Sequence, residues 1–69
     1  MKYPLVIERA ADNFGACAPD FPGLGVTGKS IEEARRLVTE GIQIYIEELR
    51  STGQDAPTPS AIVEYADIA

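Results

Sequence analysis

The residues with the most specific chemical spacing are Gly23 to Ser30, which match the Gly-x-x-x-x-Gly-Lys-Ser spacing of a phosphate-binding loop. Such a loop cradles phosphate groups with backbone N–H groups, and it needs a parallel strand before a stretch of irregular backbone. Leu24 to Val26 have the character of a strand themselves, so the required loop is missing. We interpret the match as a coincidence of spacing and expect no nucleotide to bind here.

Two side chains could act as nucleophiles, and neither has the neighbours that such chemistry needs. Cys17 is the single cysteine, and the chain contains no histidine to activate it. Ser30 has a structural task as a helix cap. Histidine is also the commonest metal ligand. The sequence therefore predicts a noncatalytic protein with no metal site and no cofactor.

Eleven acidic residues against six basic ones give the chain a net charge of −5. Direct binding of nucleic acid needs clustered Lys and Arg, and the only adjacent basic residues, Arg35 and Arg36, follow Glu32 and Glu33. The acid surplus favours a basic protein as partner, because complementary charge speeds association. The alternative is that the acidity only keeps a small protein in solution.

The length of 69 residues indicates one domain with a small core. The sequence offers neither a disulfide nor a metal site, so self-association is expected to add stability and we predict a homo-oligomer. The start of the chain lacks a signal-peptide pattern, and no apolar run approaches the roughly 20 residues that cross a bilayer. With a single cysteine, the sequence predicts a cytoplasmic protein without membrane contact.

Short strands and one long helix are expected to position these residues. Alternation and β-branched side chains predict strands over residues 3–9 and 13–18. Leu24, Val26 and the glycines at 23, 25 and 28 predict a third, weaker strand, and the three are joined as an antiparallel meander. The Pro-Asp-Phe-Pro-Gly run at residues 19–23 forms a tight turn before the third strand, and its closing glycine suits positive φ. A fourth strand is predicted over residues 61–65, after a link that contains two prolines.

The helix has the strongest local signals, and we predict it over residues 31–52. Ser30 with Glu33 three residues later forms a capping box, and Gly53 suits the position after the last turn. Apolar residues with three- and four-residue spacing form one stripe: Ile31, Ala34, Val38, Ile42, Tyr45 and Leu49. Ile46 lies off this stripe, either as an isolated exposed side chain or as a contact with another subunit.

Together these elements predict an α+β fold of order β-β-β-α-β, with one helix packed on a four-stranded mixed sheet. The fourth strand is expected to run parallel to its neighbour through a right-handed crossover. One helix covers only one face of such a sheet. The other face is therefore left for a second copy or for a partner.

Four segments carry a recognisable combination of residues: Tyr3 to Glu8, Asn13 to Ala16, Pro19 to Gly23 and Thr27 to Ala34. They resemble the N-terminal domain of HicB-family antitoxins. The resemblance implies a partial ribonuclease H-like fold of the same element order. It also implies binding to a small basic HicA-type toxin that cleaves mRNA and whose active site is blocked by contact. Full-length members usually add a C-terminal DNA-binding domain, and we expect none within residues 1–69.

The ribonuclease H-like order raises an alternative, a metal-dependent nuclease. Such enzymes hold two metal ions with carboxylates on the first strand, the helix and the fourth strand. Glu8, Glu40 and Glu64 are the nearest matches by element, and we interpret all three as solvated surface acids. A further alternative is a stand-alone oligomeric interaction module without a toxin.

Five residues are candidates for contact with a protein partner: Asp12, Asp20, Phe21, Glu47 and Glu48. Asp20 and Phe21 project from the tight turn as a charge and an anchor, although Phe21 could instead close the core. Asp12 is a turn acid, and Glu47 and Glu48 are helix acids that could meet basic toxin residues. The preferred interpretation is an antitoxin-like binding protein of a type II toxin-antitoxin system, which neutralises a HicA-type toxin by direct contact.

Overall fold

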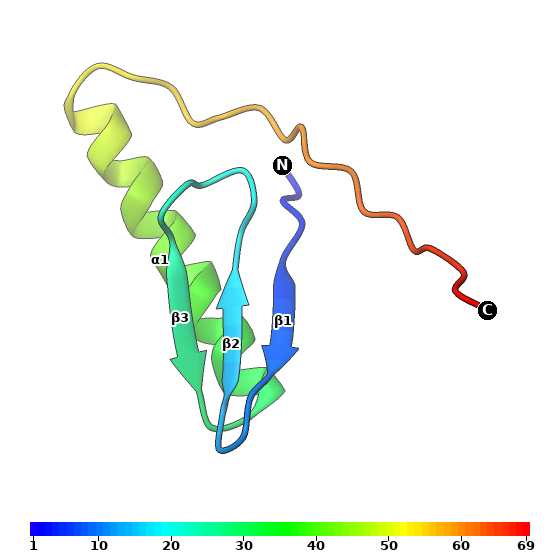
Figure 1. Ribbon diagram of the computed structural model, residues 1–69. Helices are drawn as coiled ribbons and strands as arrows, with labels where there is room; N and C mark the ends of the chain where they lie inside the picture. Colours follow the sequence, from blue (N-terminus) through cyan, green and yellow to red (C-terminus); the bar gives the residue numbers. More distant parts are fainter.

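A computed structural model describes residues 1–69 and arranges the chain as three short strands and one long helix (Figure 1). The strands are β1 (Val6–Arg9), β2 (Phe14–Cys17) and β3 (Gly25–Gly28), and the helix α1 spans Ile31–Ser51. The sheet order is β1-β2-β3, and both pairs are antiparallel. The predicted α+β class, the antiparallel meander and the single helix are therefore confirmed.

The strand register places apolar side chains on the face that α1 covers. Ile7 lies opposite Ala16, and Ala16 lies opposite Val26, so these three form one row on the helix side. The neighbouring row includes Cys17 and points to the open face, where Cys17 is exposed. Because α1 packs mainly against β3 and β2, the edge of β1 is the least covered part of the sheet.

Both ends of α1 have the hydrogen bonds that the sequence predicts. The Ser30 hydroxyl oxygen accepts a hydrogen bond from the Glu33 N–H at 3.0 Å. The Glu33 carboxylate accepts one from the Lys29 N–H at 2.8 Å, one residue before the cap. Gly53 has a φ of +81° and donates its N–H to the Arg50 carbonyl at 3.0 Å. Nowhere does α1 combine the length and apolar character of a membrane-crossing helix.

Phe21 is the centre of the core, with 1% of its surface exposed. Its ring meets those of Tyr3 and Tyr45 edge-on, at centroid distances of 4.7 and 5.2 Å. The tight turn aims Phe21 inward, since its carbonyl accepts the Leu24 N–H at 3.1 Å and Gly23 between them has a φ of +84°. The other buried apolar residues surround this ring: Ala16, Ala18, Ala34, Val38 and Ile42.

The predicted fourth strand over residues 61–65 is wrong, and the sheet has three strands instead of four. Residues 55–69, here named the extended segment, contain no helix or strand (Figure 1). The Tyr3 hydroxyl donates a hydrogen bond to the Pro57 carbonyl at 2.7 Å and holds the segment near the start of the chain. The β-β-β-α part of the expected ribonuclease H-like order is present, and its last strand is not.

Asp20 fixes the backbone at Ser60 and Ala61, just before and at the start of the predicted strand. Its Oδ1 accepts hydrogen bonds from the Ser60 N–H at 3.0 Å, the Ser60 hydroxyl at 3.0 Å and the Ala61 N–H at 3.1 Å. Successive N–H groups of a strand point in opposite directions. Two consecutive N–H groups that meet one carboxylate oxygen therefore do not belong to a strand ladder. Pro57 and Pro59 remove two further backbone donors.

Gly28→Ala is expected to destabilise the protein by about 1–3 kcal/mol, because an added Cβ would lie 2.7 Å from the backbone nitrogen of Ala34. Gly15→Ala is the matched control in the same sheet, since its Cβ would meet only the Val26 carbonyl oxygen at an ordinary 3.9 Å. Urea unfolding of the parent and both variants measures the difference in stability. Equal stability of the two variants would contradict the close approach of β3 to α1.

The attachment of the extended segment is expected to be lost in acid. The backbone hydrogen bond from Ser60 lowers the pKa of the Asp20 carboxyl against an opposing effect of burial, with further lowering by the Ser60 hydroxyl and the Ala61 N–H. A lowered pKa means that the attachment is complete above the ordinary aspartate pKa of about 3.9 and disappears as the pH falls through the lowered value. The NMR chemical shifts of the Ser60 and Ala61 amides should change in a single transition at a pH below the ordinary aspartate pKa.

Two substitutions separate this attachment from a general effect of charge. Asp20→Ala is expected to remove the protection of the Ser60 and Ala61 amides from hydrogen exchange at neutral pH. Asp12→Ala, which removes an exposed acid of the other turn, should leave both amides protected. Unchanged protection in Asp20→Ala would show that other contacts hold the segment.

Candidate protein-binding surface

The five residues predicted to contact a partner lie at both ends of the domain (Figure 1). Asp12 is exposed in the connection between β1 and β2. Asp20 and Phe21 lie in the connection between β2 and β3, at the opposite end of the sheet. Glu47 and Glu48 are exposed near the end of α1, and this part of the helix lies at the same end as Asp20. The structure thus separates Asp12 from the other four.

Asp20 and Phe21 have structural tasks in the folded chain. Phe21 is buried between two tyrosine rings, so it presents no anchor to solvent. Asp20 directs Oδ1 to Ser60 and Ala61, while its Oδ2 is buried without a hydrogen-bond partner. The turn that carries them is nevertheless part of the surface at this end, because Pro22 and Gly23 are exposed.

Glu47 and Glu48 lie on two different flanks of α1. Glu48 borders a shallow depression together with Tyr45, whose hydroxyl donates a hydrogen bond to the Pro22 carbonyl at 3.3 Å. Glu48 is therefore close to the tight turn. Glu47 borders another depression on the flank that carries Arg50.

The acids near the end of α1 carry charge that no basic side chain neutralises within the chain. The single ion pair joins Arg36 to Glu40 at 3.1 Å, and both partners are about half exposed. Glu47 and Glu48 take part in no ion pair and are free to meet a cationic side chain of another protein. Exposed acids on a chain of net charge −5 present a negative field to an approaching partner.

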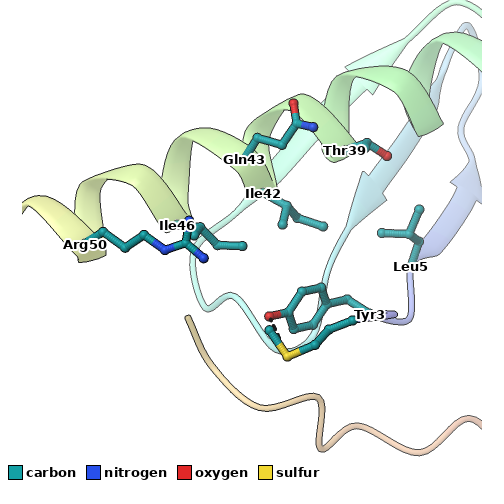
Figure 2. A pocket seen from close by; sticks show the side chains of 8 residues that line it. Tyr3, Leu5, Thr39, Ile42, Gln43, Ile46 and Arg50 are labelled. Atoms are coloured by element: carbon teal, nitrogen blue, oxygen red, sulfur yellow. Dashed lines mark hydrogen bonds between the residues drawn. The ribbon is translucent and has the colours of Figure 1, made fainter. Parts of the chain in front are cut away.

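A groove of about 400 Å³ beside α1 is a feature that the sequence analysis did not predict (Figure 2). Tyr3 and Leu5 form one wall, and Ile42, Ile46 and Arg50 form the other. The spacing of the helical residues, four apart, was visible in the sequence as a side stripe. The opposite wall comes from the start of the chain, and only the tertiary structure brings it there. Ile46 is half-buried here and not an isolated exposed side chain.

The residues considered for catalysis are not brought together. The segment that resembles a phosphate-binding loop forms β3, and Ser30 caps α1 as predicted. Glu8 lies on β1, Glu40 on α1 and Glu64 in the extended segment, and all three are exposed. No group of three or more acidic or cysteine side chains is placed to hold a metal ion. What the arrangement offers chemically is a charged and partly apolar surface for contact.

A phage protein is similar to this chain. It is an uncharacterised 14.9 kDa protein of the rep-hol intergenic region of Haemophilus phage HP1 (strain HP1c1), 31% identical over 65 residues. The aligned region is 94% of this chain and 49% of the phage protein, so the chain spans about half the length of this curated relative. No solved structure gives a significant match.

A family model matches residues 3–68, and its description is the HicB-like antitoxin of bacterial toxin-antitoxin systems. The matched region contains β1 to β3, α1 and the extended segment to within one residue of Ala69. The resemblance seen in the turn at residues 19–23 and at the start of α1 is thereby confirmed. Because the match extends over nearly the whole chain, the protein belongs to the HicB-like antitoxin family.

Proposed function

We propose that the protein neutralises a small basic HicA-type toxin by direct contact that masks the active site of the toxin. The observation that carries the proposal is the family match over residues 3–68. The acid surplus supports it, since a net charge of −5 complements a cationic partner. In this role the protein catalyses no reaction. It excludes the RNA substrate from the active site of the toxin.

The end of the domain that carries Glu47, Glu48 and the tight turn is the proposed contact surface. Both acids are exposed and unpaired, and Glu48 is next to Tyr45, whose hydroxyl reaches the turn at Pro22. A rigid turn beside unpaired acids offers a fixed pattern of negative charge. Electrostatic attraction of this kind mainly raises the rate of association and falls with salt.

Self-association in the cytoplasm is part of the proposal. One helix covers one face of the sheet, and the other face contains exposed side chains such as Val6 and Cys17. A small domain with seven buried residues of 69 gains stability when a second copy covers apolar surface. Toxin contact through the acidic end of α1 leaves other faces available for that second copy.

Co-expression with a small basic HicA-type toxin is expected to restore growth that the toxin inhibits, and the two proteins should copurify. Glu47→Lys with Glu48→Lys should weaken the complex by about tenfold at low salt, since two favourable charge contacts become repulsive. Isothermal titration measures the affinity. Absence of both rescue and complex with the parent chain would contradict the antitoxin role.

Glu8→Lys with Glu32→Lys is the matched control for the contact surface. It changes the net charge by the same amount, and both residues are exposed, away from the end of α1 and in no ion pair. The control should retain most of the affinity. Equal weakening by the two pairs would contradict a localised contact at Glu47 and Glu48 and indicate a long-range effect of charge.

A further inference from the structure

The groove beside α1 adjoins an unpaired strand edge. β1 is at one side of the sheet order, so one of its edges has no neighbouring strand. Leu5 in the groove wall directly precedes β1, and Figure 2 shows the Leu5 side chain facing the helix across the groove. An unpaired edge with an apolar groove beneath it suits an extended peptide, which adds backbone hydrogen bonds at the edge and side chains in the groove.

The extended segment has the composition of such a peptide and no partner for it. Ile62, Val63, Tyr65 and Ile68 are 84%, 56%, 93% and 88% exposed. β-branched and aromatic residues at this density favour a strand. Large apolar side chains gathered in one stretch of a small domain mark an interaction site. The last hydrogen bonds of the segment with the rest of the protein are those of Ser60 and Ala61.

Arg50 is the basic residue of the groove lining. Glu47 lies beside it, in the adjoining depression that Ile46 and Arg50 also border. Glu8 on β1 points to the opposite face of the sheet, in the row of Gly15.

The extended segment carries two acids, Glu64 and Asp67, among its apolar residues. Its apolar side chains suit the apolar lining of the groove, and one acid can lie beside Arg50.

The path of the chain favours a second copy over the same copy as the source of this peptide. The segment already passes the groove wall at Pro57, whose carbonyl accepts a hydrogen bond from the Tyr3 hydroxyl at 2.7 Å. Asp20 then fixes Ser60 and Ala61, and the following residues lead away from the sheet of their own chain (Figure 1). Another molecule can receive residues 62–68 without any change to these attachments.

We infer that residues 62–68 of one chain dock on the β1 edge and in the groove of a second copy, which returns its own segment in the same way. Such a reciprocal exchange closes a twofold dimer with two identical contacts. The inference specifies the self-association proposed above and does not depend on a toxin. It assigns Ile46 and Arg50 to the receiving surface, and Ile62 and Tyr65 to the inserted peptide.

Sedimentation of the 69-residue chain over a range of concentrations tests the exchange. The expected particle has twice the 7.4 kDa mass of one chain. Ile62→Ser with Tyr65→Ser should weaken association by about 100-fold, because two large apolar side chains lose their burial. Ile44→Ser is the control, since Ile44 is 57% exposed on α1 and outside the groove. A monomeric parent chain, or a dimer that the double substitution leaves intact, would overturn the inference.

Mixing two defective chains tests the reciprocity. Ile46→Ser with Arg50→Glu impairs the groove, and Arg50→Glu alone serves the same purpose if the pair lowers stability. Neither this variant nor the segment variant should dimerise alone. Their mixture should recover a dimer held by one intact contact, and absence of recovery would overturn the exchange.

Two further readouts separate the exchange from its alternatives. Protection of the amides of residues 62–68 from hydrogen exchange in a monomeric chain would show pairing with its own β1, and it would overturn the exchange. The segment variant keeps Glu47 and Glu48, so its affinity for the toxin-like protein is measured independently. Retained toxin binding with a lost dimer is the expected result.

Discussion

The contact of Phe21 with Tyr3 and Tyr45 is the interaction on which the rest of the structure depends. It joins the start of the chain, the tight turn and the end of α1 through two edge-to-face ring pairs. Truncation of a buried phenylalanine typically costs about 3–5 kcal/mol, which is a large part of the stability of a small domain. The two tyrosines extend the contact further, since their hydroxyls hold Pro57 and Pro22. The groove wall at Tyr3 exists because Phe21 fixes that ring.

The order β-β-β-α could be predicted because local chemistry decides it. Ser30 and Glu33 mark the start of α1 within a few residues, and a glycine is needed where the turn requires positive φ. The fourth strand was predicted from β-branched residues alone. In the structure the carboxylate of Asp20 instead holds the backbone of Ser60, 40 residues further along the chain, and residues 61–65 pair with no strand. Strand propensity describes a preference of the segment and contains no information about a distant acceptor.

For the candidate binding residues too, sequence patterns could predict some properties, while tertiary contacts decided the others. Asp20 and Phe21 were candidates for contact with a partner. In the structure Phe21 is buried in the core and Asp20 accepts hydrogen bonds from its own chain. Whether a turn residue points inward depends on what lies beneath it, which no short pattern records. Glu47 and Glu48 were placed correctly on the surface, because the apolar stripe of α1 fixes which helix positions face the core. The groove escaped prediction because Tyr3 and Ile46 are far apart in sequence.

The two proposed contacts respond to salt in opposite ways, and this difference lets one small domain serve both. Each copy has a net charge of −5, so two copies repel one another over long range while apolar side chains hold them at short range. Added salt screens this repulsion and strengthens the hydrophobic effect, so the affinity of self-association should rise. Attraction to a cationic toxin weakens under the same conditions. The acidic end of α1 and the apolar segment thus depend on different forces, and the two contacts adjoin at the depression that Glu47 shares with Ile46 and Arg50.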